Sequence, residues 1–302
     1  MTEERRIKNL EVPKGKIDVV LDTDAYNEID DQFAIAYLLR SNEKLNTKAI
    51  YAAPFQNSRS SGAADGMEKS YNEIFKILEL LGKSLPVFRG SDSFLSNESA
   101  PVISDAANDL AKRALCYSPE NPLYVVAIGA ITNVASAILI NHKVAENTVV
   151  IWLGGNATHF SHNREFNLKQ DIAAARVVME SGVSFVQLPC MGVVSSFSVS
   201  RPELETFLVG KNPLADYLAR NTIEYAEAYA KNKIWSKPIW DVTAIAWLIN
   251  DEDRFMLSRL TNIKLPSYDG YFTDKPDSNL MRYVYHINRD ALINDLFEKI
   301  LR

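Results

Sequence analysis

The sequence predicts an α/β protein with an open, mainly parallel sheet flanked by helices. Apolar runs of strand length alternate with segments of helical period, and this strand–loop–helix unit recurs along the chain. With 302 residues, 47% of them hydrophobic and 24% charged, the chain can bury a large core. Because no repeat or linker-like stretch interrupts the pattern, we expect one domain over residues 1–302.

The elements follow from apolar spacing and from the residues that end each segment. Short apolar runs predict strands at 17–22, 48–54, 123–130, 148–155 and 184–189. Helical spacing predicts helices at 30–41, 67–81, 131–140, 171–182, near 214–231, at 241–249 and from about 290. The helix beginning at Met67 is the best marked, because Gly82 stands where a helix C′ residue belongs. Residues 263–287 are expected to form a hairpin or an edge pair.

Polar residues and glycines follow the predicted strands at their carboxyl ends. In open parallel sheets, ligands bind outside these ends. The residues in question are Asp22 and Asp24 after the first strand, Gln56 and Asn57 after the second, Gly129 after the third, and 154–156 after the fourth. We therefore expect the functional site at this edge of the sheet.

Composition excludes several classes of partner. A net charge of -5 and a pI near 5.5 give no basic field for nucleic acid. No apolar run is long enough for a membrane span, and the N-terminal residues lack the apolar segment of a signal peptide, so a cytoplasmic protein is expected. Cys116 and Cys190 are too few for a disulfide framework and are interpreted as buried thiols.

The stretch "VVLDTDAYNEIDDQ" at 19–32 concentrates Asp22, Asp24, Asp30 and Asp31 around one strand–helix turn. Four carboxylates in a shared concave site raise one another's pKa unless a cation compensates them. A hard divalent ion, which takes carboxylate and carbonyl oxygens, removes this conflict. The alternative is that two of these aspartates favour the helix N-terminus while the others are solvated.

A phosphatase motif of the haloacid-dehalogenase type is a further interpretation of the same stretch. In that motif the first aspartate of a strand-end DxD is a nucleophile and magnesium binds beside it. Those enzymes usually have Thr or Val two residues after the second aspartate, where this chain has Tyr26. They also lack an Asp-Asp pair at the start of the next helix, so this interpretation is disfavoured.

Four segments, in order along the chain, resemble the calcium-dependent nucleoside hydrolases of the inosine-uridine-preferring superfamily. The family signature DxDPGxDDAxA resembles "DTDAYNEIDDQFA" (22–34), which has two extra residues and no Pro-Gly. The other three segments are "AIGAITNVASAI" (127–138), "WLGGNATHFSHNREFNLKQDIAAA" (152–175) and "WDVTAIA" (240–246). The Asp-Asp pair and the EFN triplet are the most specific parts. A nucleoside-hydrolase-like fold with a Rossmann-like core is thereby implied.

Carried over position by position, the resemblance implies a site for Ca²⁺. Its ligands would be Asp24, Asp31, Asp241 and the main-chain carbonyl of Ile128. The residues that would bind the sugar are Asp30, Asn57, Glu165 and Asn167. Asp22 would lie behind the ligands and orient them.

The implied reaction is hydrolysis of the N-glycosidic bond of ribonucleosides to ribose and free base. Its transition state resembles an oxocarbenium ion, and water must reach the anomeric carbon as the base departs. Asp24 would accept the proton of that water, and nearby carboxylates would stabilise the positive charge on the ring. The partner would be a small-molecule nucleoside or riboside, the role nucleoside or purine salvage, and the assembly a homodimer or homotetramer.

Several departures from the family pattern limit this expectation. Asn27 and Glu28 replace Pro-Gly and would either contact the substrate or only reshape the turn. Trp240 stands where the inosine-uridine type has His, which resembles the purine-specific branch, where aromatic rings stack on the base; the alternative is a wall residue without a catalytic role.

The loop before Glu165 offers weaker candidates for contacts with the leaving base, namely His159, His162 and Arg164, and Asn156, after the fourth strand, would lie at the edge of the site. Because a fold does not by itself fix an activity, a catalytically weak nucleoside- or sugar-binding relative and a hydrolase of another riboside remain alternatives.

Overall fold

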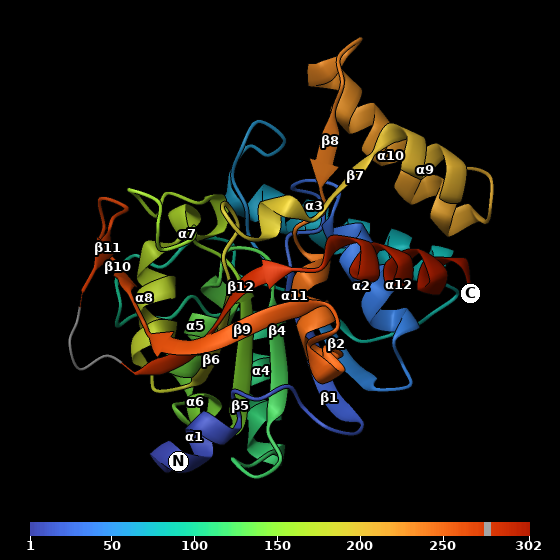
Figure 1. Ribbon diagram of the computed structural model, residues 1–302. Helices are drawn as coiled ribbons and strands as arrows, with labels where there is room; N and C mark the ends of the chain where they lie inside the picture. The colour runs from blue at the N-terminus through green and yellow to red at the C-terminus, as the bar shows by residue number, and fades with distance from the viewer. Residues whose placement is uncertain (275–278) are drawn as a thin grey trace.

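The computed structural model of the protein describes residues 1–274 and 279–302 and is built around an eight-stranded sheet (Figure 1). The strand order is β3-β2-β1-β4-β5-β6-β12-β9. The bounds are β1 (Ile17–Thr23), β2 (Leu45–Ala52), β3 (Val87–Arg89), β4 (Leu123–Ala127), β5 (Thr148–Leu153), β6 (Ser184–Leu188), β9 (Met256–Asn262) and β12 (Leu280–Ile287). Neighbouring strands are parallel except for β12 and β9. The predicted α/β class is confirmed.

The remaining regular structure consists of helices and two small ribbons. The helices are α1 (Glu3–Lys8), α2 (Asp31–Arg40), α3 (Ala63–Leu80), α4 (Asp105–Arg113), α5 (Thr132–Ile140), α6 (Lys143–Asn147), α7 (Phe166–Gln170), α8 (Ile172–Glu180), α9 (Arg201–Phe207), α10 (Pro213–Ala230), α11 (Val242–Leu248) and α12 (Arg289–Leu301). The antiparallel ribbons pair β7 (Ser198–Ser200) with β8 (Ser236–Pro238) and β10 (Leu265–Pro266) with β11 (Phe272–Thr273). Figure 1 shows β8, α9 and α10 at the top of the molecule and α1 at the bottom.

Helices cover both faces of the sheet because successive strand residues point to opposite sides. Val19 and Leu21 of β1 belong to a core cluster with residues of α2, α11 and α12, whereas Val20 belongs to a second cluster with residues of α4, α5 and α8. Every residue of β4, β5 and β6 is buried. Among the described helices, none is long and apolar enough to cross a membrane.

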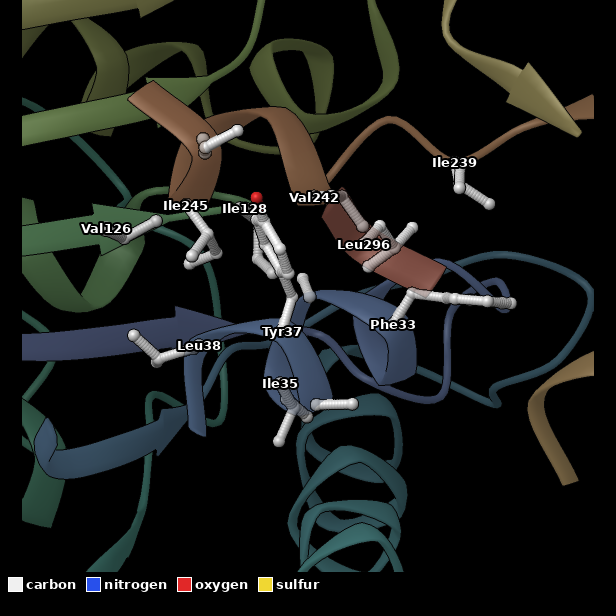
Figure 2. Close-up of a cluster of buried hydrophobic side chains, with 14 of the residues drawn as sticks. Phe33, Ile35, Tyr37, Leu38, Val126, Ile128, Ile239, Val242, Ile245 and Leu296 are labelled. Carbon is white, nitrogen blue, oxygen red and sulfur yellow. The ribbon is translucent and has the colours of Figure 1, made fainter. Parts of the chain in front are cut away.

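The packing of α2 against α11 brings distant parts of the chain to one place. Figure 2 shows Tyr37 of α2 among Ile245 of α11, Leu296 of α12 and neighbouring apolar side chains, all buried. Asp31 is the first residue of α2 and Asp241 directly precedes α11. This apolar contact therefore fixes the two helix N-termini that carry these carboxylates.

The site edge lies at the point where the strand order reverses. From β1 the chain proceeds to β2 and β3 on one side, and β4 returns to pair with β1 on the other. The backbone N–H of Ile128, just after β4, donates to the Asp22 carbonyl oxygen at 2.9 Å. The carboxyl ends of β1 and β4 therefore lie side by side, as expected for a ligand site in an open sheet.

Most expected elements are present with shifted bounds. The second strand begins three residues early, at Leu45, and the helix predicted from Met67 begins at Ala63. A hairpin or an edge pair was expected within 263–287, and the antiparallel β10–β11 hairpin lies in that range. β12 also lies there and pairs with the edge strand β9, which begins earlier, at Met256. Residues 275–278 lie outside the described residues.

Candidate active site

A cavity of about 400 Å³ opens at the carboxyl edge of the sheet. Carboxylates line it together with apolar and aromatic side chains. The acidic residues are Asp24, Glu28, Asp30, Asp31, Glu165 and Asp241, and the aromatic ones are Phe160, Phe166 and Trp240. Such a cavity can hold a ligand with a polar part and a flat apolar part.

Three of these carboxylates converge in the cavity. Asp30, Asp31 and Asp241 each offer an oxygen, and these oxygens lie within 4.8 Å of one another. The exposed fractions of the three residues are 2%, 1% and 4%. Asp30 and Asp241 are the N-caps of α2 and α11, where the helix dipole favours negative charge. The convergence of Asp31 with Asp241 agrees with the sequence-based expectation, and Asp30 joins them.

Burial and mutual repulsion make these carboxyls reluctant to ionise. Burial raises the pKa of Asp31 to about 8, with the charge of Asp30 adding to the effect. Burial raises the pKa of Asp30 to about 6, although the nearby Lys237 cation opposes that rise. The pKa values of Asp24 and Asp241 are raised well above the usual range, first by burial and then by the neighbouring aspartates. A bound cation would lower these pKa values and favour the ionised carboxylates.

Asp22 and Asp24 carry buried oxygens that lack a hydrogen-bond partner among the described residues. Asn133 Nδ2 donates to Asp22 Oδ1 at 2.7 Å, but Oδ2 of Asp22 and Oδ2 of Asp24 receive nothing. Burial raises the pKa of Asp22 to about 7. A buried acceptor without a donor is costly, and a cation would satisfy the one on Asp24.

The donor set therefore fits a hard divalent cation. The carboxylate oxygens of Asp30, Asp31 and Asp241 converge there, and Ile128, whose carbonyl is the main-chain ligand that the resemblance implies, lines the same cavity. Thr23 Oγ1 donates to Asp31 Oδ1 at 2.5 Å and holds that carboxylate in place. Neither Thr23 nor Asn133 was singled out from the sequence, although each lies inside a motif segment.

Glu165 and Asn167 are held firmly at the cavity wall. Glu165 caps α7, and its carboxylate accepts from the backbone N–H groups of Gly155, Asn167 and Leu168 at 2.9, 2.9 and 3.0 Å. Burial raises the pKa of Glu165 even though these bonds oppose the rise. Asn167 Nδ2 donates to the carbonyl oxygen of Ile128 at 3.0 Å, which leaves that oxygen one further lone pair.

Asn156 also faces the cavity and has an acceptor to spare. It is 3% exposed, and its backbone N–H donates to Asn163 Oδ1 at 2.6 Å. Its side-chain Oδ1 has no partner among the described residues. A hydroxyl or N–H of a ligand in the cavity would satisfy that oxygen.

The inserted turn reaches the cavity through both of its polar residues. Asn27 and Glu28 line the wall, and Glu28 forms an ion pair with the buried Lys237 of β8. Asn57 does not line the cavity. Its Nδ2 instead donates to Asn27 Oδ1 at 2.6 Å and so holds the turn. Sequence reasoning missed Lys237, because nothing local marks a lysine 209 residues from its partner.

The remaining candidates occupy different places. Trp240 is half-buried in the cavity wall, whereas His159 is exposed outside the cavity, 5.1 Å from the Phe160 ring. The expectation of two buried thiols was wrong for Cys116, which is exposed near a turn. Cys190 is half-buried in the cavity wall, and burial raises the pKa of its thiol. It is therefore an unreactive wall residue.

Fold and site together define an α/β protein with a buried acidic cluster that can hold a metal ion. The family model for inosine-uridine preferring nucleoside hydrolases matches residues 19–275. The chain therefore belongs to that family, whose members are hydrolases that act on N-glycosidic bonds.

Known relatives differ in the base they prefer. The pyrimidine-specific ribonucleoside hydrolase RihA of Citrobacter koseri is 26% identical, with 90% of this chain and 94% of that protein covered. Among solved structures, the purine-preferring ribonucleoside hydrolase of Gardnerella vaginalis has a TM-score of 0.76 at 16% identity, covering 94% of this chain and 98% of that one. A plant nucleoside hydrolase, PpNRh1, has a TM-score of 0.72 at 20% identity, covering 94% and 99%. These structural likenesses show the fold.

Proposed function

We propose that the protein hydrolyses the N-glycosidic bond of ribonucleosides with calcium as its metal, and that purine ribosides are preferred. The observation that carries the proposal is the convergence of Asp30, Asp31 and Asp241 in a cavity that Asp24 also lines, with its Oδ2 unpartnered among the described residues. Phe166 and Trp240 line the same cavity. A ribose and a base therefore find complementary surfaces in one cavity.

Calcium suits this donor set because it accepts six to eight oxygens in loose geometry. Asp24, Asp31, Asp241 and the Ile128 carbonyl would hold it. When bound, such an ion offsets the clustered negative charge and activates water as a Lewis acid. The rest of the chemistry belongs to the side chains around it.

Asp24 would act as the general base. It lines the cavity, and one of its carboxylate oxygens would hold the ion while the other takes the proton of a water that attacks the anomeric carbon. As the bond between that carbon and the base nitrogen breaks, its electron pair leaves with the base. Asp30 would accept from a ribose hydroxyl, while Asp30 and Glu165 stabilise the positive charge that develops on the sugar ring.

Release of reducing sugar from a panel of nucleosides and other ribosides, with calcium or with EDTA, tests this function. We expect ribose from purine nucleosides with calcium and none after chelation. Activity that is indifferent to EDTA would contradict the role of the metal. If other ribosides were cleaved while nucleosides remained intact, the natural substrate would have a different leaving group.

A second candidate is a catalytically weak relative that binds a nucleoside or sugar. The inserted turn favours it, because Asn27 and Glu28 reach the cavity wall where the family signature has Pro-Gly. Saturable binding of inosine without release of ribose, measured by calorimetry with calcium present, would support this candidate over the enzyme.

A further inference from the structure

One cation stands apart in the cavity wall. Of the described residues that line the cavity, only Arg164 carries a permanent positive charge. It lies in the loop before Glu165, and the same cavity is lined by the rings of Phe160, Phe166 and Trp240. A guanidinium beside aromatic rings offers hydrogen bonds to the edge of a flat heterocycle whose faces the rings contact.

The β10–β11 ribbon holds Arg164 in place without neutralising it. Arg164 Nε donates to the Asp269 carbonyl oxygen at 3.1 Å, and the guanidinium carbon lies 5.1 Å from the centre of the Tyr271 ring. A Cβ on Gly270 would lie 2.5 Å from Arg164 Cγ, so the absence of a side chain there makes room for the arginine stem. No carboxylate pairs with Arg164 among the described residues, so its charge is available to a ligand.

The neighbouring imidazole of His162 also lines the cavity, but its Nδ1 already accepts a hydrogen bond from the backbone N–H of Arg164, at 3.3 Å. Trp240 has only its indole N–H, which does not act as an acid.

We propose that Arg164 is the group that stabilises the departing base, and that the base class is a 6-oxopurine. The inference rests on the proposed function and deepens it. When the glycosidic bond breaks, its electron pair enters the purine, and negative charge grows on N7 and O6. The two parallel N–H donors of a guanidinium match those two acceptors. Arginine does not release a proton, so the base leaves as a hydrogen-bonded anion and takes its proton from water.

The paired N–H donors of the guanidinium disfavour 6-aminopurines. Adenine presents an amino donor beside N7, and that donor would face the donors of the guanidinium. The chain should therefore cleave inosine and guanosine better than adenosine. Arg164 would determine that preference.

The test compares inosine, adenosine and p-nitrophenyl riboside with the parent and R164A, with calcium present. The p-nitrophenolate group leaves without assistance. For R164A we expect kcat with inosine to fall roughly tenfold to a hundredfold, the scale of one lost hydrogen bond to a charged group. Turnover of p-nitrophenyl riboside should be nearly unchanged, and the preference for inosine over adenosine should shrink. R164K keeps the charge but loses the paired N–H donors of the guanidinium. Its kcat with inosine should lie between those of the parent and R164A.

The control is R176A. Arg176 Nη1 donates to the Pro266 carbonyl oxygen at 3.0 Å, so it contacts the same ribbon without lining the cavity. If R164A acted only by loosening the ribbon, R176A would reproduce its effect on inosine. That result, or an equal loss with all three substrates, would overturn the proposal.

A further variant, H162A, tests the neighbouring imidazole. A loss confined to inosine in H162A, together with an unchanged R164A, would assign the leaving-group role to the histidine and overturn the proposal for Arg164. A parent that cleaves neither nucleosides nor p-nitrophenyl riboside would refute the proposed function itself. A parent active on p-nitrophenyl riboside but indifferent to R164A would refute only the role of Arg164.

Discussion

Asp24 combines two properties that a general base needs in a buried site. One of its oxygens has no partner among the described residues, and its backbone is fixed because the Asn27 N–H donates to its carbonyl at 2.7 Å. Gly129 contributes by having no side chain, since a Cβ there would lie 3.0 Å from Asp24 Cγ. The carboxylate is therefore both free to react and confined to one place.

Asp24→Asn should remove turnover while leaving the ligand site intact. The amide keeps an oxygen for the cation but cannot accept the proton of the attacking water. Loss of a general base typically lowers the rate by ~10²–10⁴-fold. We expect this loss in kcat for inosine, whereas a ribose-like inhibitor still binds in calorimetry. Turnover within a few-fold of the parent would place the base elsewhere.

Trp240 is the second residue whose role depends on the substrate. Stacking on the indole supplies electron density that favours a departing heteroaromatic ring, and base–aromatic stacking is worth about 1–3 kcal/mol. Trp240→Ala should therefore lower kcat for inosine roughly tenfold to a hundredfold and affect p-nitrophenyl riboside much less. Equal losses with both substrates would identify Trp240 as a packing residue, in keeping with its partial burial against the core.

At the level of elements, the inserted turn is tied to the strand that leads into α11. Glu28 pairs with Lys237 of β8, and three residues later the chain reaches Trp240 and Asp241. Arg59 donates weakly to the carbonyl oxygens of Asn27 and Glu28, both at 3.4 Å, from the other side. The two-residue insertion is thus clamped at both ends, so it shapes the wall rather than forming a loose loop.

The metal site depends on the N-termini of two helices, α2 and α11. Asp31→Ala/Asp241→Ala should therefore abolish the binding of about one calcium per chain, since it removes a carboxylate from each helix. Elemental analysis of protein purified without chelator measures this directly. The matched control is Asp105→Ala/Asp290→Ala, which removes exposed aspartates from the first turns of α4 and α12. Full metal content in the first variant would reject the assignment.

Across the whole molecule, elements with strong local signals were predictable. The central strands β1, β4, β5 and β6 are buried apolar runs, and α3 has a regular apolar stripe that ends before Gly82 in the left-handed conformation. The ribbon of β7 and β8 was not predicted, because each strand has only three residues and is defined by the pairing of Ser198–Ser200 with Ser236–Pro238. Nor was α4, whose nine residues include three alanines and one leucine.

The residues of the site fall into the same two groups: those with a local sequence signal and those that depend on contacts between distant segments. Asp24, Asp31 and Asp241 could be singled out because carboxylates at strand ends and helix starts form recognisable motifs; all three line the cavity, and Asp31 and Asp241 converge with Asp30. Lys237 could not be found in this way, because its place at the site depends on an ion pair with Glu28, which lies far away in the sequence. Asn57 was assigned to the sugar from the family resemblance; its amide contacts Asn27, which lines the cavity, while Asn57 itself does not. A sequence pattern shows which strand end a side chain follows, but not which residue that side chain contacts.

The stability of the molecule should depend on pH in opposite ways with and without metal. An unfolded aspartate has a pKa near 4, whereas burial raises the pKa of Asp30 to about 6, of Asp22 to about 7 and of Asp31 to about 8. Raised values mean that the metal-free folded state binds more protons than the unfolded state. The stabilisation from these groups is therefore fully present below about pH 4 and is lost progressively as pH rises from there to about 8, the highest of these pKa values.

Calcium reverses this trend, because its ligands must be deprotonated and its affinity therefore rises with pH. The melting temperature with EDTA should fall between pH 5 and pH 8, and the difference between calcium-loaded and EDTA-treated protein should widen over the same range. Differential scanning calorimetry at several pH values measures both. Asp31→Asn/Asp241→Asn should flatten the EDTA curve and remove the calcium effect, because it takes away two of the titrating ligands. A calcium effect that stayed constant or shrank as pH rose would show that these carboxylates do not hold the ion.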